Sequence, residues 1–286
     1  FRIKSTNPID ELLTLESARA ELAAEIEDNT LVVSAKPCSK EKVNAMAYTK
    51  GISYEIEPAY FNSVKAVYLV DLRKTLPDSV VVCDRSVITN LKAMVPSGME
   101  YKYYSDLMDI RFPERSLYDT LYFSVQHYIR SDNQEIFSLG PELPFSGGVS
   151  VTLKPAIPYS MDKKTAVYRV NGNSLSYEGG VWANGKLTFA PRELGDFTIL
   201  SDTIPPSITR IYANNQAVRF KISDRLSGIS TFEATINGKW LLLDYDAKSH
   251  AIVSRRLNPD ELIRGDFELT VTDQAGNKKT YTQKII

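Results

Sequence analysis

The stretch that decides the fold class is Trp182-Ala183-Asn184-Gly185-Lys186-Leu187-Thr188-Phe189. An Asn-Gly pair readily adopts the positive φ angles of a type I′ turn, so the stretch predicts a β-hairpin. Outward from it, strand-like alternation recurs over residues 121–125, 149–153 and 166–170. Short strands at near-regular spacing indicate antiparallel sandwiches and not β-α-β units.

Toward the C-terminus, the segment Asp202-Thr203-Ile204-Pro205-Pro206-Ser207-Ile208 predicts a linker. Two adjacent prolines fix φ and resist both helix formation and central-strand pairing. Turn signals follow at Asn237-Gly238 and Ala275-Gly276-Asn277. About seven short strands in the remaining stretch are typical of an immunoglobulin-like sandwich. We therefore expect an immunoglobulin-like β-sandwich over residues 204–286.

Toward the N-terminus, strand-like runs over 31–35, 51–56, 64–70 and 80–83 predict an N-terminal β-sandwich over residues 1–97, followed by a central β-sandwich over 98–203. Before these strands, Asn7-Pro8 has the form of a helix start, and an apolar stripe runs from Leu12 to Ile26. We expect one N-terminal α-helix over about residues 8–28. The predicted class is mostly β, with tandem antiparallel β-sandwiches and this single helix.

Composition limits the classes of partner. Hydrophobic residues make up 43% of the 286 residues, which is enough to build real cores. The 34 basic and 35 acidic residues give a net charge of -1, so we expect no nucleic-acid partner. No apolar run approaches the roughly 20 residues of a membrane helix, so we expect no membrane span. The chain starts at Phe1 without a signal segment, so we expect it to be part of a longer protein, and what precedes Phe1 stays open.

Few residues carry candidate chemistry. Cys38 and Cys83 fit no metal spacing. They could form a disulfide in an exported protein, or each could be a small buried hydrophobe. His127 and His250 have no second histidine or carboxylate at ligand spacing, so we expect packed or solvated imidazoles. No catalytic, cofactor-binding or metal-ligating residue is assigned, and no cofactor is expected.

Three weaker signals have simple structural alternatives. Residues 180–186 match the spacing of a phosphate-binding loop, but Leu187 stands where Ser or Thr would bind Mg²⁺. The carboxylate pairs Asp244 with Asp246 and Asp106 with Asp109 could do acid–base work, but in turns they more often accept backbone hydrogen bonds. In Tyr101-Lys102-Tyr103-Tyr104, the first and third residues share one strand face, which permits a sugar-stacking platform or cross-strand packing.

Several motifs together carry a family resemblance. They are Val67-Tyr68-Leu69-Val70-Asp71-Leu72-Arg73, Leu76-Pro77-Asp78, residues 112–120, Gly179-Gly180-Val181-Trp182, Leu194-Gly195-Asp196-Phe197, residues 202–208, residues 224–230, residues 237–240, residues 244–246 and Thr272-Asp273-Gln274-Ala275-Gly276-Asn277. The ordered set resembles the non-catalytic C-terminal region of large exported lysostaphin-type zinc peptidases of Bacteroidetes-like bacteria. The middle block is also similar to the sandwich domains of ankyrins and netrin receptors, which are interaction modules.

The resemblance implies a parent enzyme that cuts peptide crosslinks of peptidoglycan in the periplasm or at the cell surface. The family's H-x-x-x-D and H-x-H zinc motifs do not occur around His127 or His250, so we expect this chain to be no enzyme itself. The predicted function is a non-catalytic accessory region that positions the peptidase or binds envelope polymer or a protein partner. The alternative is a free-standing surface adhesion or glycan-binding protein, and a third possibility is an enzyme with an unrecognised site. Ligand and oligomeric state stay open.

Overall fold

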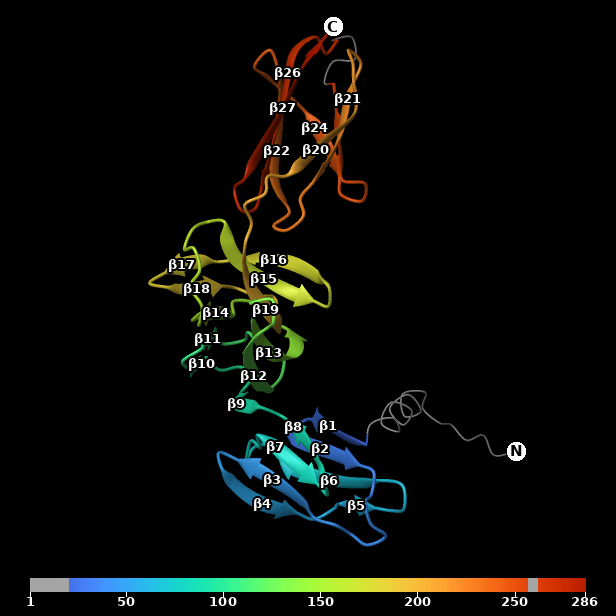
Figure 1. The fold of residues 1–286 in the computed structure, drawn as a ribbon, viewed down its shortest axis with the longest axis vertical. Helices are drawn as coiled ribbons and strands as arrows, with labels where there is room; N and C mark the ends of the chain where they lie inside the picture. The colour runs from blue at the N-terminus through green and yellow to red at the C-terminus, as the bar shows by residue number, and fades with distance from the viewer. Residues whose placement is uncertain (1–20, 257–261) are drawn as a thin grey trace, which may run out of the picture.

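The computed structural model describes residues 21–256 and 262–286, and within these ranges every regular element is a β-strand. The strands form six antiparallel sheets, which pair into three units with separate apolar cores. The units follow one another along the long axis of the molecule (Figure 1). The prediction of a mostly β chain of tandem antiparallel sandwiches is confirmed.

The first unit pairs the sheet β1-β2-β6-β5 with the sheet β4-β3-β7-β8. Alternate residues of β2 and β6 are buried, as expected for strands with one face on a core. Tyr68 is buried at its centre, and its hydroxyl donates to Val43 O over 2.8 Å. The strands are β1 (Leu22–Glu27), β2 (Thr30–Ala35), β3 (Ala45–Thr49), β4 (Ile52–Ile56), β5 (Tyr60–Phe61), β6 (Ala66–Asp71), β7 (Ser79–Val82) and β8 (Arg85–Ile88).

The expected helix over residues 8–28 is not found where the structure can test it. Residues 8–20 lie outside the described residues, but Leu22–Glu27 form β1, which pairs with β2. Leu22 and Ile26 are four residues apart, so they share a face in a helix and also in a strand. Asp28, with a φ of 52°, turns the chain between β1 and β2 and does not end a helix. Pairing with β2 therefore decides the conformation.

The second unit pairs the sheet β10-β11-β14-β18-β17 with the sheet β16-β15-β19-β13-β12-β9. The predicted hairpin is confirmed, since Asn184 and Gly185 have φ angles of 51° and 74° between β17 and β18. The phosphate-loop-like spacing falls on this hairpin. The strands are β9 (Leu91–Val95), β10 (Tyr101–Tyr104), β11 (Met108–Phe112), β12 (Leu121–Ile129), β13 (Glu135–Pro144), β14 (Ser150–Leu153), β15 (Thr165–Asn171), β16 (Ser174–Gly179), β17 (Val181–Ala183), β18 (Lys186–Phe189) and β19 (Glu193–Ser201).

Strand β9 joins the first two units. It precedes the expected boundary at residue 97, yet it pairs with β12 at the edge of a second-unit sheet. Its residue Leu91 packs into the first core, whereas Ala93 and Val95 belong to the second. Tyr122 of β12 also packs into the first core, and its hydroxyl donates to Asn29 Oδ1 over 2.6 Å. Apolar packing therefore continues across this junction.

The third unit pairs the sheet β20-β21-β25-β24 with the sheet β23-β22-β26-β27. This order is that of an immunoglobulin sandwich, with strands A-B-E-D facing C-F-G and one added strand, so the predicted immunoglobulin-like fold class is confirmed. Phe220 and Phe267 stack between the sheets with centroids 5.4 Å apart. The strands are β20 (Ser207–Ala213), β21 (Val218–Ser223), β22 (Ile229–Ile236), β23 (Lys239–Leu241), β24 (Leu243–Asp246), β25 (Ala251–Ser254), β26 (Gly265–Asp273) and β27 (Lys278–Ile285).

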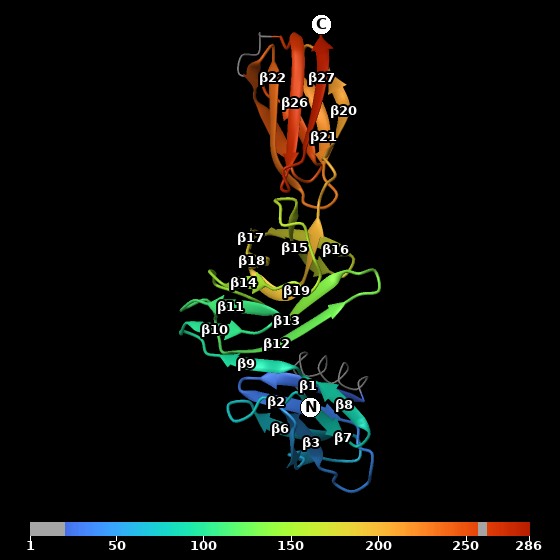
Figure 2. The ribbon, with the colours of Figure 1, turned by 60° about the vertical axis from the view of Figure 1, so that its left-hand side comes forward.

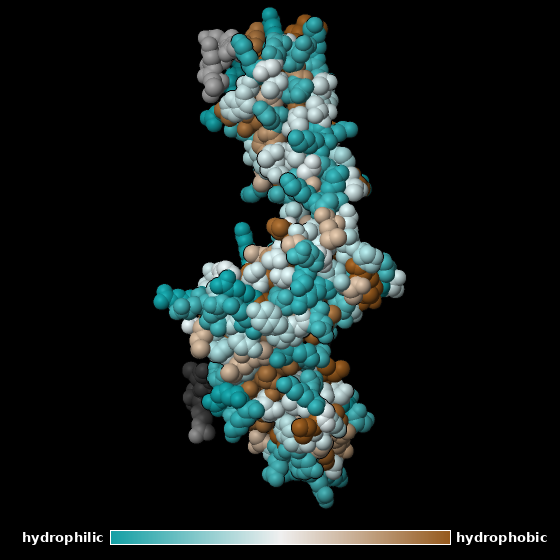
Figure 3. All heavy atoms as spheres, turned by 90° about the vertical axis from the view of Figure 1, so that its left-hand side faces the viewer, coloured by the Kyte–Doolittle hydropathy of each residue, from teal (hydrophilic) through white to brown (hydrophobic). Residues whose placement is uncertain are grey.

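The surface of the described residues is mostly hydrophilic to neutral on the face drawn in Figure 3, with hydrophobic residues in small groups. Among the described residues no helix is long and apolar enough to cross a membrane.

Candidate functional site

His127, which is half-buried, pairs with the buried Glu135. The two residues lie on the neighbouring strands β12 and β13, and Nε2 of His127 is 2.7 Å from Oε1 of Glu135. The imidazole also packs on Phe137 with ring centroids 5.0 Å apart. Glu135 is fully buried and accepts a second hydrogen bond from Ala156 N. Burial, together with the Glu135 carboxylate, raises the pKa of Tyr159 well above its ordinary value. His127 is thus a packed imidazole with a carboxylate partner that sequence spacing did not reveal.

The other histidine lies in a different unit. His250 is exposed in the turn between β24 and β25, where its Nδ1 is 3.4 Å from the Tyr245 hydroxyl. The structure therefore does not bring His127 and His250 together. Of the carboxylates that the sequence singled out, only Asp246 accepts local hydrogen bonds, from Lys248 N and Ser249 Oγ. Asp244 forms an ion pair with Arg255 and Asp109 with Lys154, and Asp106 is exposed.

Tyr101 and Tyr103 share one face of β10, and that face packs against the second core. The rings of Tyr103 and Phe123 meet edge to face with centroids 4.8 Å apart. The outward residues are Lys102 and Tyr104, and Tyr104 is 69% exposed. Packing, and not a sugar platform, therefore explains the two tyrosines that the sequence placed together.

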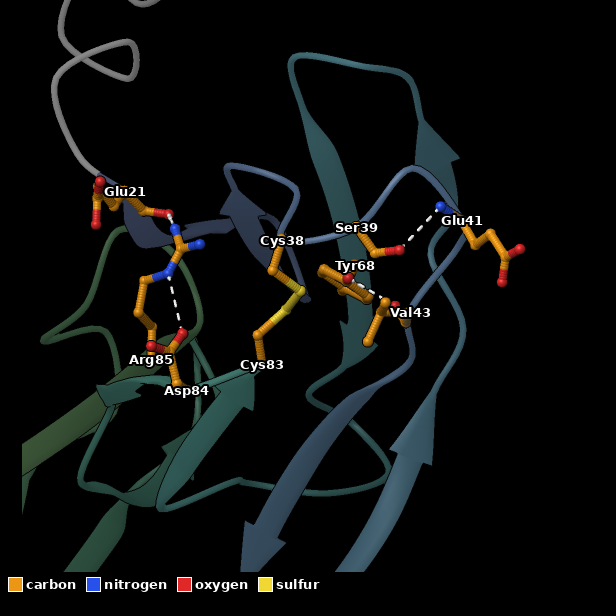
Figure 4. The surroundings of a disulfide bond; sticks show 9 residues. All are labelled: Glu21, Cys38, Ser39, Glu41, Val43, Tyr68, Cys83, Asp84 and Arg85. Atoms are coloured by element: carbon orange, nitrogen blue, oxygen red, sulfur yellow. Dashed lines mark hydrogen bonds and ion pairs between the residues drawn. A yellow bond between two sulfur atoms is a disulfide. The ribbon is translucent and has the colours of Figure 1, made fainter.

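Cys38 and Cys83 form a disulfide (Figure 4). Cys38 follows β2 of one sheet, and Cys83 lies in the turn between β7 and β8 of the other. Their Cα atoms are 6.5 Å apart. The bond therefore links the two sheets of the first unit. The sequence left open a disulfide or two separate buried cysteines, and the structure contains the disulfide.

Three aspartates converge where the second unit meets the third. Asp202 follows β19, Asp224 follows β21, and Asp273 ends β26. One carboxylate oxygen from each lies within 4.8 Å of those from the other two. Asp202 and Asp273 are 3% and 1% exposed, and Asp224 is half-buried. Figure 2 shows the chain passing between the two units here, from β19 to β20. Three buried or half-buried negative charges at one place are costly unless something compensates them.

Hydrogen bonds hold the three carboxylates in place. Each carboxylate accepts two, and Asn277 also donates to the backbone carbonyl of Asp202 and so bridges the units. The donors are the backbone N–H groups of Ile204, Ser227, Leu226, Gly228 and Asn277 and the side-chain amide of Asn277. Within residues 21–256 and 262–286, no lysine, arginine or histidine forms an ion pair with any of the three aspartates.

Tyr168 of β15 belongs to the second unit and interacts electrostatically with this cluster. Val167 points into the second core, so the adjacent Tyr168 points to the opposite face of the sheet. Tyr168 is nevertheless 0% exposed, and its hydroxyl has no hydrogen-bond partner in the described part of the chain. Burial raises the pKa of Tyr168 well above its ordinary value, and the charges of Asp202, Asp224 and Asp273 raise it further. The phenol therefore lies in the field of all three carboxylates.

Tyr177 of β16 is the second tyrosine of the second unit near the three aspartates. Its ring meets Tyr168 edge to face with centroids 5.5 Å apart, and its hydroxyl lies 3.5 Å from Gln274 O of the third unit. Burial, together with Asp273, raises the pKa of Tyr177. Two tyrosines of the second unit thus interact with an acidic cluster contributed mainly by the third.

This cluster of three aspartates is not predicted by the sequence. Each aspartate lies in a motif that carried the family resemblance, within residues 202–208, 224–230 and 272–277. No short spacing connects the three, because they come from the ends of different strands. These three motifs were the only indication in the sequence that the aspartates could matter. The fold brings the motifs together in space.

The fold defines a protein with tandem β-sandwiches, of which the third unit is immunoglobulin-like. Within it, residues 92–202 match the family model of the Zu5-like domain. The match covers the second unit from β9 to Asp202 and supports a β-rich domain there. No curated protein matches the chain at a significant level.

Proposed function

We infer that this chain is a non-catalytic accessory region of an exported cell-envelope peptidase that acts on peptidoglycan. In this role it positions the enzyme or binds envelope polymer or a protein partner. The observation that carries the proposal is the row of three sandwiches, each with its own core (Figure 1). Such a row separates whatever is attached at its two ends, which suits a spacer.

Two further observations support this proposal. The disulfide between Cys38 and Cys83 suits an oxidising compartment outside the cytoplasm. The Zu5-like match and the immunoglobulin-like unit are β-rich domains of the kind expected in an accessory region. The peptidase parentage itself comes from the motif resemblance and remains part of the proposal.

The test uses the chain fused behind a peptidoglycan endopeptidase domain, compared with that domain alone. We expect the fusion to remain longer on purified cell-wall sacculi, or to cleave them in a different pattern. We expect the chain by itself to release no new amino termini, with or without Zn²⁺. Zinc-dependent hydrolysis by the chain alone would contradict the proposal, as would identical behaviour of the fusion and the isolated domain.

The alternative of a glycan-binding surface protein now depends on other aromatic residues. Tyr101 and Tyr103 pack inward, but Trp240 on the edge strand β23 is 62% exposed. Flat exposed rings stack on sugars at a low entropic cost. Specific binding on a glycan array that Trp240→Ala abolishes and Tyr104→Ala preserves would favour this alternative.

A further inference from the structure

We propose that Asp202, Asp224 and Asp273, with the Tyr168 phenol beside them, form a Ca²⁺ site that fixes the third unit to the second. The site is independent of the peptidase parentage. It rests on the charge, spacing and burial of groups on both sides of the junction.

The charge of the cluster is the first argument. Three carboxylates lie within 4.8 Å of one another, and two of them are almost fully buried. Carboxylates this close repel one another, and burial removes the water that would screen them. The hydrogen-bond donors around them are uncharged backbone and side-chain amides. A divalent cation supplies the missing positive charge.

The spacing is the second argument. Ca²⁺ binds oxygen at about 2.3–2.6 Å, so two of its ligands can be up to about 5 Å apart. Mg²⁺ binds at about 2.0–2.1 Å, which allows at most about 4 Å. The ligand atoms of the cluster all lie within 4.8 Å of one another, which is inside the range that Ca²⁺ can bridge. Each oxygen of Asp202 and Asp273 accepts one amide hydrogen bond and keeps a second lone pair for a cation. Asp224 accepts both of its hydrogen bonds at Oδ2, which leaves Oδ1 for a cation.

The unpartnered hydroxyl of Tyr168 supports the site independently of the carboxylates. This hydroxyl is buried without a partner, although a buried polar group normally has one. The ring of Tyr168 packs on Tyr177, whose hydroxyl lies 3.5 Å from Gln274 O, next to Asp273 in the chain, so the phenol lies beside the cluster. The charges of the three aspartates, together with Tyr177, act on it. A cation at the cluster, directly or through its bound water, gives the hydroxyl a partner.

The proposed site lies between the second and third units, so a bound cation would affect how they move relative to each other. Asp202 belongs to the second unit, whereas Asp224 and Asp273 belong to the third. A cation held by all three couples the units and restricts their relative motion. Calcium removal is therefore expected to loosen the junction while leaving both sandwich cores intact.

The experiment titrates the intact chain, freed of metal with a chelator, with Tb³⁺ as a luminescent substitute for Ca²⁺. Tyr177, whose hydroxyl lies 3.5 Å from Gln274 O next to Asp273, and its ring neighbour Tyr168 are the expected sensitisers of the lanthanide. We expect the bound Tb³⁺ to luminesce, and we expect Ca²⁺ to displace it and quench the signal with a dissociation constant for Ca²⁺ at or below about 1 mM. The same concentration of Mg²⁺ should not displace Tb³⁺. We also expect millimolar Ca²⁺ to raise the melting temperature and to slow proteolysis within residues 203–206.

Variants assign the signal to the site. We expect Asp224→Asn and Tyr168→Phe each to weaken Ca²⁺ binding by about tenfold or more. The matched control Asp244→Asn, on an exposed carboxylate of the same unit, should leave it unchanged. Tyr168→Phe removes only a hydroxyl without a hydrogen bond, so folding does not depend on it. The proposal is overturned if the wild type shows no calcium response in luminescence or melting, or if these two variants bind Ca²⁺ as Asp244→Asn does.

Discussion

At the scale of the residue, Tyr168 shows how burial becomes pH dependence. Its pKa is raised in the folded chain, so the folded state keeps the phenolic proton at a pH where the unfolded state loses it. The unfolded state then binds fewer protons, and the free energy of unfolding falls as the pH rises above the ordinary tyrosine value of about 10. The stability that depends on this proton is therefore fully present at neutral pH and is lost in alkali.

We predict that Tyr168→Phe reduces this alkaline loss of stability. The difference in slope between wild type and variant should approach about 1.4 kcal/mol per pH unit above pH 10 or so. The measurement is urea unfolding across the alkaline range in the presence of a chelator, which separates the proton effect from any effect of calcium. Tyr104→Phe, at an exposed position, is the control and should retain the wild-type slope. Equal slopes for all three proteins would contradict the prediction.

At the scale of the element, the start of β26 depends on a glycine. Gly265 has a φ of 121°, and a Cβ atom there would lie 2.1 Å from Oδ1 of Asn237. Asn237, in the turn between β22 and β23, accepts a hydrogen bond from Asp266 N and donates one to Arg264 O. The asparagine thus ties this turn to the beginning of β26, and no side chain fits between them.

We predict that Gly265→Ala destabilises the third unit by about 2–4 kcal/mol, because backbone strain and a steric clash add together. Gly238→Ala is the matched control, since Gly238 also has a positive φ but has open space around it. It should cost only about 1 kcal/mol, for the strain alone. Denaturant unfolding followed by the fluorescence of Trp240 measures both. Equal costs would show that Asn237 moves away freely.

Strand pairing also determines features that the local sequence does not predict. Residues 22–26 satisfy the helical and the strand period equally, and β2 decides between them by supplying backbone partners. Likewise, Glu135 and His127 are eight residues apart in the chain but meet across the β12–β13 pair. Spacing rules for helices and loops do not detect such a contact.

At the scale of the whole molecule, the three units lie in a row and the diproline segment connects the last two (Figure 1). A compact globule of this length would have a radius of gyration of about 19 Å. We predict that small-angle X-ray scattering of the intact chain gives a clearly larger value. Replacing Pro205 and Pro206 together by glycine should broaden the distance distribution in the presence of a chelator, because the linker then loses its fixed φ angles. A radius near that of a globule would contradict the extended arrangement.

Features that depend on neighbouring residues in the chain could be predicted from the amino-acid sequence. The Asn-Gly turns at 184–185 and 237–238, the alternation of the strands and the diproline linker follow from local backbone preferences, and these predicted tandem sandwiches with an immunoglobulin-like end. Three features depend on long-range contacts and appear only in the folded chain. They are the strand conformation of residues 22–27, the pairing of Cys38 with Cys83, and the cluster of Asp202, Asp224 and Asp273 near Tyr168. The physical reason is that these contacts join segments far apart in the chain, and β-sheet topology, which sets which segments meet, is not encoded in any short window of residues.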